Sequence, residues 1–199
     1  KVLESGKGPW LARYTDNHDE GRGLHRFGEG AVRAVEQLVF LTGHCIPFLL
    51  TGQEFGALNR PSIHERMSDC DKGPAVVVKN AVSLRPGIEF EGNIFARGRE
   101  SRLEWYDFYK KLIRLRLELP ELREGDFKLI DAGEQAKPSE KSVIAFERSL
   151  EKSVIRCAVN LGSKAARLDN ADLFAGNSLY GSIKGNKLAA FSAVVVRGT

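Results

Sequence analysis

A continuous apolar run, "CIPFLLTG", occupies residues 45–52 and directly follows an amphipathic segment that ends at Gly43. The apolar residues of that segment recur at steps of three and four, which predicts a helix: Ala31, Ala34, Val35, Leu38, Val39 and Thr42. An uninterrupted apolar run of this length is typical of a strand in a parallel sheet that is covered on both faces. A strand is also predicted from Trp10 to about Asp16. The order strand, helix, strand therefore indicates a parallel crossover unit.

The pattern changes near Arg123. Before it, a long helix is predicted from about Ser101 to Leu119, with Pro120 ending it. After it, strands separated by Gly, Asn, Pro and Lys-Ser turns are predicted at 127–131, 142–149, 153–161 and 188–197. The second and third of these are close enough in sequence to form an antiparallel hairpin. We expect an α/β domain over residues 1–123 and a small antiparallel sheet or sandwich over residues 124–199.

Residues 52 to about 100 show no regular pattern. Short strand-like pieces occur only at "AVVVK" and "NIFAR". Connections of this length in a compact domain are usually functional or poorly ordered.

Composition argues against several classes of function. The net charge of +4 is spread evenly along the 199 residues without a basic tract, which argues against nucleic-acid binding. An apolar run of about 18 residues, the length that a membrane span needs, does not occur. The cysteines Cys45, Cys70 and Cys157 are odd in number and lack metal-ligand spacing, so neither a disulfide framework nor a zinc site is expected. We expect no metal and no other cofactor.

The stretch "RYTDNHDEGR", Arg13 to Arg22, concentrates charged and imidazole side chains where the first predicted strand ends. In parallel α/β folds, residues just past the carboxyl end of a strand face the ligand. However, Asp, Asn and Gly are also the ordinary residues of a strand-to-helix turn. The stretch by itself is therefore compatible with an active site or with a solvated turn.

The order of several motifs favours the first interpretation. "TDNHD" is followed by Arg22, a helix, "IPFLLTGQEFG", the helix "FYKKLIRLRLELPEL" and a β-rich tail. This order resembles the last part of the α-amylase family of glycoside hydrolases. The resemblance implies the seventh and eighth strands and the last helix of a (β/α)8 barrel, followed by a small antiparallel β domain of the sandwich type.

The resemblance also implies roles for individual residues. Asp19 would be the family's third carboxylate, which holds sugar hydroxyls beside the scissile bond and stabilises the transition state. His18 would contact the same sugar. Arg22 would pair with a carboxylate or reach a sugar, and it is equally well explained as a solvated loop residue. Asn17 is expected to orient the loop, and Glu54 is expected to be structural or to line the rim. No role is expected for the remaining histidines, His25, His44 and His64.

The nucleophile and the acid/base carboxylate of the family, about 5 Å apart in a retaining enzyme, lie on its fourth and fifth strands. We recognise neither strand in this chain, and we do not expect Asp19 and Glu54 to replace that pair. The chain is therefore expected to be a fragment of a retaining α-glucan hydrolase or transglycosylase. It would be inactive alone and would need the missing N-terminal barrel portion as its partner. The alternative is a relative that has lost the chemistry and serves as a carbohydrate-binding or protein-interaction module.

Overall fold

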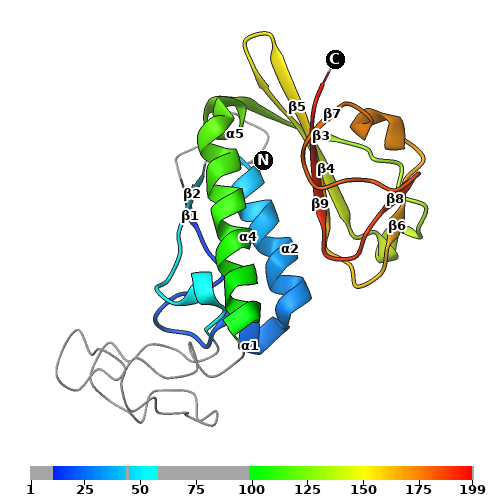
Figure 1. The fold of residues 1–199 in the computed structure, drawn as a ribbon. Coiled ribbons are helices and arrows are strands. Elements are labelled where there is room, and N and C mark those ends of the chain that lie inside the picture. The colour runs from blue at the N-terminus through cyan, green and yellow to red at the C-terminus, as the bar shows by residue number, and fades with distance from the viewer. Residues whose placement is uncertain (1–10, 44, 58–98, 199) are drawn as a thin grey trace, which may run out of the picture. The chain divides into compact units, whose positions relative to one another are not determined.

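The computed structural model describes residues 11–43, 45–57 and 99–198 (Figure 1). Contacts divide the chain into two compact units. One comprises Lys1–Arg13, Glu29–Pro47 and Leu112–Thr199, and the other comprises Tyr14–Gly28 and Phe48–Lys111. These units differ from the ranges 1–123 and 124–199, so the domain boundary near residue 123 stays a prediction. The two strand-like pieces, together with Trp10, His44, His64 and Cys70, lie outside the described residues.

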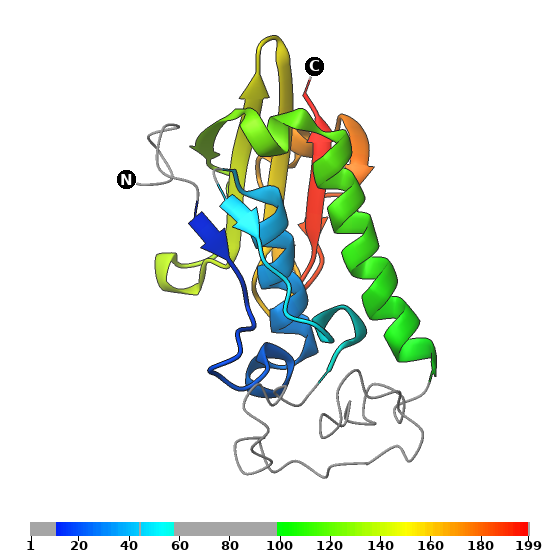
Figure 2. The same ribbon diagram turned by 90° about the vertical axis from the view of Figure 1, so that its left-hand side faces the viewer.

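Two short parallel strands, β1 (Leu11–Arg13) and β2 (Cys45–Pro47), lie side by side (Figure 2). The helix α2 (Glu29–Leu41) connects them in sequence, which confirms the predicted order of strand, helix and strand. Both strands are shorter than predicted, since the patterns extend to Asp16 and Gly52. The second strand cannot continue through Gly52, because this residue adopts a left-handed conformation with φ of 92°.

The helices differ from the prediction at two points. A short helix, α1 (Gly23–Phe27), forms between the first predicted strand and the predicted helix, where no helix was predicted. The long helix α4 (Arg99–Glu118) ends before Pro120, as predicted. After an extended Leu119, Pro120 begins a further short helix, α5 (Pro120–Glu124), which was not predicted. Proline is favoured at the first position of a helix because the amide that it lacks has no intrahelical partner there.

The remainder of the chain is mainly antiparallel β structure. One sheet has the order β3 (Asp126–Ile130), β4 (Val143–Leu150), β5 (Ser153–Asn160), β9 (Ala193–Arg197) and β7 (Asn177–Tyr180). A second sheet pairs β6 (Ala166–Arg167) with β8 (Lys187–Leu188). The predicted hairpin is confirmed, with Leu150 opposite Ser153 at its turn. The single strand predicted over 188–197 is divided into β8 and β9, because the chain turns at Phe191, whose φ is 52°.

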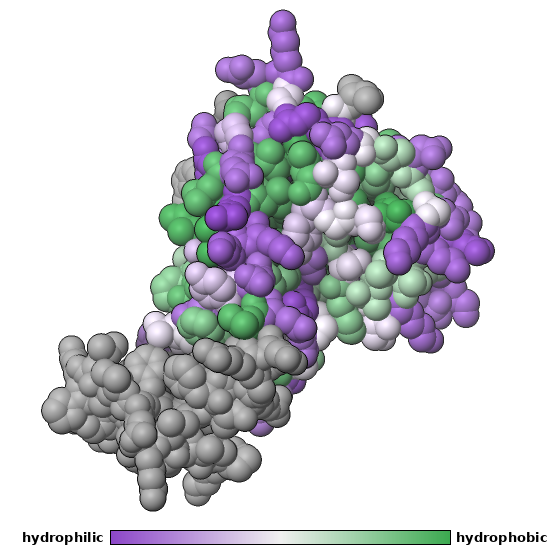
Figure 3. Space-filling view, viewed as in Figure 1, coloured by the Kyte–Doolittle hydropathy of each residue, from purple (hydrophilic) through white to green (hydrophobic). Residues whose placement is uncertain are grey.

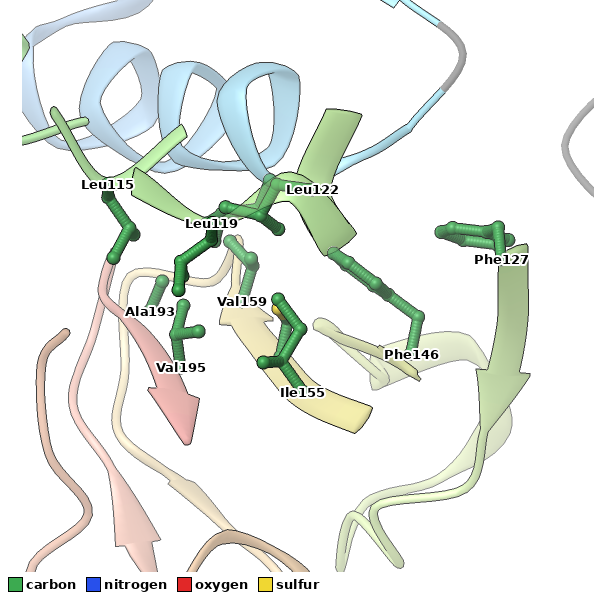
Figure 4. Close-up of a cluster of buried hydrophobic side chains, with 11 residues drawn as sticks. Leu115, Leu119, Leu122, Phe127, Phe146, Ile155, Val159, Ala193 and Val195 are labelled. Atoms are coloured by element: carbon green, nitrogen blue, oxygen red, sulfur yellow. The ribbon is translucent and has the colours of Figure 1, made fainter. Parts of the chain in front are cut away.

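Successive residues of the larger sheet contribute to two separate hydrophobic clusters, because side chains alternate between the faces of a strand. Ala145 belongs to one cluster and its neighbour Phe146 to the other. The cluster in Figure 4 combines sheet residues with Leu115 of α4, Leu122 of α5 and Leu119 between the two helices. The other cluster combines the sheet with Leu188 of β8, among others. Both faces of the sheet are therefore covered.

Two buried arginines bond carbonyl groups where helices end. Arg116 donates to the carbonyl oxygens of Phe40, Thr42, Cys45 and Leu122 over 2.7–3.1 Å. Arg148, on β4, donates to those of Glu121 at 3.1 Å and Gly125 at 2.6 Å. The last carbonyls of a helix lack intrahelical partners, and a cation near them is also favoured by the helix dipole. Burial lowers the pKa of both guanidinium groups, that of Arg148 to about 10.

Candidate functional site

The loops that follow β1 and β2 begin at the same end of the strand pair, because the two strands are parallel. The first loop, residues 14–22, contains the "TDNHDEGR" stretch, and the second, residues 48–55, contains "FLLTGQEF". Both loops belong to the same compact unit. Because the strands are parallel, "DNHDE" and "GQE" both follow the carboxyl end of this strand pair.

Asp16 closes the first loop at its base. Its carboxylate accepts a hydrogen bond from the Gly23 amide through Oδ1 at 2.7 Å, and another from Arg22 Nη1 through Oδ2 at 3.2 Å. The side chains of Asp16 and Arg22 are each only 3% exposed. Because a buried charge is costly without a partner, this ion pair is a strong constraint on the loop.

Arg22 also connects the first loop to the second. Its Nη2 donates to the carbonyl oxygen of Thr51 at 2.5 Å, and Nη1 lies 3.5 Å from that of Leu50. Of the alternatives for Arg22, the structure thus shows the ion pair with a carboxylate, and the burial of the side chain contradicts a solvated loop residue. Contact between Arg22 and a sugar stays a prediction.

Asn17 shapes the turn within the first loop. Its Oδ1 accepts hydrogen bonds from the amides of Asp19 at 2.9 Å and Glu20 at 2.8 Å. This bonding is an Asx turn, and it confirms that Asn17 orients the loop.

His18 and Asp19 lie at the exposed part of this turn. Their side chains are 53% and 77% exposed, and His18 Nε2 is 3.4 Å from Asp19 Oδ1. The two predicted site residues are therefore adjacent and accessible, and their roles toward a substrate stay predictions.

Gln53 forms a second connection between the loops. It is 4% exposed, and its Nε2 donates to Thr15 Oγ1 and to the Tyr109 hydroxyl, both at 2.9 Å. Its Oε1 accepts from the Leu50 amide at 3.1 Å. The amide of Gln53 thus joins the first loop, the second loop and α4, all within one unit.

Glu54 has a structural contact, as expected. Its Oε2 accepts from the Gly52 amide at 2.9 Å within a short 3-10 helix, η1 (Gln53–Phe55). Gly56 ends η1 with φ of 65°, and a Cβ on Gly56 would lie 2.7 Å from the indole ring of Trp105. The second loop is consequently packed closely against α4 at this point.

Aromatic side chains accompany the polar groups. Tyr14 and Phe48, the residues directly after β1 and β2, meet edge to face with ring centroids 6.1 Å apart, and each is about half exposed. Phe55 and Tyr106 stack with centroids 5.7 Å apart. Both aromatic pairs belong to the same compact unit as the two loops.

From the sequence, His18, Asp19 and Arg22 were predicted site residues, and pairing with a carboxylate was one alternative for Arg22, but Asp16 and Gln53 were not singled out. Asp16 was visible as part of the acidic cluster, and its place at the end of the strand pattern was the available signal. Gln53, Thr15 and Tyr109 had none, since Gln53 lies 38 and 56 positions from its two partners. His25 lies on α1 and is exposed.

Within the described residues, no group of three or more His, Cys, Asp and Glu side chains is arranged to hold a metal ion. Cys45 and Cys157 are buried free thiols, and burial raises the pKa of Cys157. The helices of the described ranges include none with the length and apolar character of a membrane span.

No protein-family model and no curated protein matches this chain. Solved structures do match it. A trehalulose synthase, MutB, superposes with a TM-score of 0.65 and 17% identity, covering 97% of this chain and 44% of its own. An α-amylase from H. orenii superposes with a TM-score of 0.65 and 20% identity, covering 94% of this chain and 40% of its own. A debranching enzyme from Nostoc punctiforme superposes with a TM-score of 0.60 and 22% identity, covering 96% of this chain and 34% of its own.

These likenesses show that the chain has the fold of a part of α-amylase-family enzymes. They confirm, at the level of the fold, the resemblance drawn from the order of the motifs. The chain spans less than half the length of each of these neighbours.

Proposed function

We propose that this chain is the C-terminal part of a retaining α-glucan-active glycoside hydrolase or transglycosylase. It would contribute the seventh and eighth barrel strands, the last barrel helix and a β domain beginning near residue 124. The observation that carries the proposal is the parallel pair β1–β2, whose carboxyl-terminal loops hold "DNHDEGR" and "GQE" and are joined by Arg22 and Gln53. This arrangement occurs in a fold shared with α-amylase-family structures.

In this proposal, Asp19 is the carboxylate that stabilises the transition state. An ionised carboxylate can accept hydrogen bonds from two sugar hydroxyls, and such bonds strengthen as the sugar ring flattens toward an oxocarbenium ion. His18, whose imidazole lies beside Asp19, would contact the same sugar. The exposure of both side chains leaves them accessible to a ligand.

The nucleophile and the acid/base would come from the N-terminal barrel portion. Glu54 is a poor candidate for either, because its carboxylate bonds the Gly52 amide within its own turn. Among the similar structures, a MutB variant was solved with its substrate sucrose, and the debranching enzyme was soaked with acarbose. We infer an α-glucan or a related oligosaccharide as the substrate.

Exposed apolar side chains support the need for a further barrel portion. On α4, Leu103, Tyr106, Ile113 and Leu117 are 38–64% exposed and recur at helical spacing. Ile46, on β2, is 57% exposed. Hydrophobic side chains also lie among hydrophilic ones on the face shown in Figure 3. Short parallel strands are normally found in sheets with both faces covered and with further strands at their edges.

A non-catalytic carbohydrate-binding or protein-interaction relative is the second candidate. The observation that favours it is the exposure of Asp19 and His18 on the first loop, together with the half-exposed Tyr14 and Phe48 at the starts of the two loops. Exposed polar and aromatic side chains of this kind could bind a sugar without cleaving it. The two candidates differ in what the longer protein contains. A nucleophile and an acid/base carboxylate upstream would support the enzyme, and their absence would support the binding module.

The test is therefore to sequence the gene upstream of Lys1 and to assay the longer protein with Asp19→Asn. We expect the substitution to lower kcat by about 10²–10⁴-fold with little effect on thermal stability, since it removes transition-state contacts from an exposed residue. Glu20→Gln is the matched control, because Glu20 is an exposed carboxylate of the same loop that bonds Arg26. Near-normal turnover in Asp19→Asn would show that Asp19 is an ordinary turn residue.

A further inference from the structure

We propose that Arg22 is a positioning residue for Asp19 and does not itself contact the sugar. This inference rests on the proposed function of Asp19. It changes the role expected for Arg22 from binding substrate to fixing the geometry of the loop that presents Asp19.

Burial is the first argument. The Arg22 side chain is 3% exposed, whereas the neighbouring side chains of His18 and Asp19 are 53% and 77% exposed. A sugar can reach His18 and Asp19 directly, but it could reach the guanidinium only if the two loops separated. A guanidinium held this way acts on a substrate through the groups that it bonds.

The bonding pattern is the second argument. Nη1 bonds the Asp16 carboxylate, and Nη2 bonds the Thr51 carbonyl on the other loop. A planar guanidinium presents donors in fixed directions, so it sets both the distance and the angle between its two partners. A lysine ammonium keeps the charge but has no such fork, and it cannot reproduce both bonds in the same geometry.

The third argument is how the loop transmits this constraint. Asp16 bonds Arg22 and the Gly23 amide, which fixes the two ends of the segment that contains Asp19. Between those ends, Asn17 bonds the Asp19 amide and sets the turn. Arg22 thereby fixes the base of the loop to Thr51, and Asn17 fixes Asp19 to the base.

A double-mutant cycle in the longer enzyme tests the proposal. We expect Arg22→Lys to lower kcat by about 10- to 100-fold with little change in KM, because a misplacement of about 1 Å of a catalytic group costs on this order. In an Asp19→Asn background, Arg22→Lys should cause almost no further loss, since the group that it positions is already gone. Arg26→Lys is the control, because Arg26 forms an exposed ion pair with Glu20 in the same segment.

Amide hydrogen exchange on the present chain provides a readout that needs no activity. Arg22→Lys should speed exchange at the amides of Gly23 and Asp19, and Arg26→Lys should not. Unchanged exchange at both amides would overturn the positioning role.

Kinetic outcomes separate this inference from the function on which it rests. Normal turnover in Asp19→Asn contradicts the proposed function. Low turnover in Asp19→Asn, with an undiminished further loss from Arg22→Lys, contradicts the positioning role alone. A rise in KM at constant kcat in Arg22→Lys would assign Arg22 to direct sugar binding and would also overturn the inference.

Discussion

The guanidinium of Arg148, on β4, lies directly against the backbone of Gly43, two residues beyond the end of α2. A Cβ atom at position 43 would lie only 1.6 Å from Arg148 Nη1. The missing side chain of Gly43 therefore leaves the space that the buried guanidinium of Arg148 occupies.

Gly43→Ala should destabilise the fold by about 3 kcal/mol, because Arg148 is fully buried and must shift away from the carbonyls that it bonds. Arg148→Met should cost about 2–4 kcal/mol by leaving those carbonyls without a donor. Denaturant unfolding measures both values.

The double variant provides the check on this contact. In an Arg148→Met background, the flexible thioether can move, so Gly43→Ala should cost less than about 1 kcal/mol. Equal costs of Gly43→Ala in both backgrounds would contradict the steric argument.

The hydrogen bonds of the Glu121 carboxylate, on α5, predict that the free energy of unfolding decreases at acidic pH. Burial raises the pKa of this carboxyl, but hydrogen bonds from Ser153 Oγ at 2.5 Å and Arg197 Nη1 at 3.0 Å outweigh burial, so its pKa lies below the ordinary value of about 4.5. A lowered folded-state pKa stabilises the fold above the unfolded pKa, and this stability is lost as the pH falls through the folded pKa. The free energy of unfolding should therefore decline below about pH 4.5, and this decline should be smaller in Glu121→Gln.

Glu124→Gln is the matched control for this pH profile. Glu124 ends the same helix, and its side chain is 61% exposed. Urea unfolding between pH 3 and pH 7 should give parallel curves for Glu124→Gln and the unsubstituted chain. Parallel curves for Glu121→Gln as well would refute the role given to Glu121.

Glu151, in the turn between β4 and β5, has a φ of 53°, which is left-handed. A side chain costs about 1 kcal/mol in this conformation, and glycine does not carry that cost. Glu151→Gly is expected to stabilise the chain by up to about 1 kcal/mol. Glu151→Ala retains the Cβ and should give no gain in the same unfolding experiment; a gain from alanine would point to the charge instead of the backbone.

The chain by itself should hydrolyse no α-glucan. Cleavage of a glycosidic bond requires protonation of the leaving oxygen and attack at the anomeric carbon, and Asp19 in its proposed role supplies neither. Starch, maltooligosaccharides and an activated aryl α-glucoside are suitable substrates. Turnover that disappears in Asp19→Asn or Glu54→Gln would instead show that these two carboxylates form an active pair.

Regular patterns in the sequence were enough to predict the elements whose stability depends on one buried face. The long helix predicted before Pro120 forms as α4, and Trp105, Tyr109 and Leu112 belong to its buried side. The short separation of two apolar runs predicted the β4–β5 hairpin. Such predictions succeed because burial of apolar side chains imposes the period of the helix or strand on the sequence itself.

The ends of elements were less predictable. The strand pattern of residues 188–197 contains no proline or glycine, yet the chain turns at Phe191. The apolar run that begins at Cys45 leaves the strand conformation after Pro47. In both places the residues are apolar enough to be buried in a strand or in a turn, so hydrophobicity alone does not distinguish the two.

The sequence by itself determined which residues around Asp19 carry charge. The predicted parallel crossover also implied that the loops after the two strands follow the same end of the strand pair. Only the tertiary structure decided which side chains hold those loops together. Arg22 donates to the carbonyl of Thr51, which is 29 positions away in the sequence. Gln53 donates to the hydroxyl of Tyr109, which is 56 positions away. Hydrogen bonds of this kind depend on the directions of single donors and acceptors, and folding brings those groups together without leaving a period in the sequence.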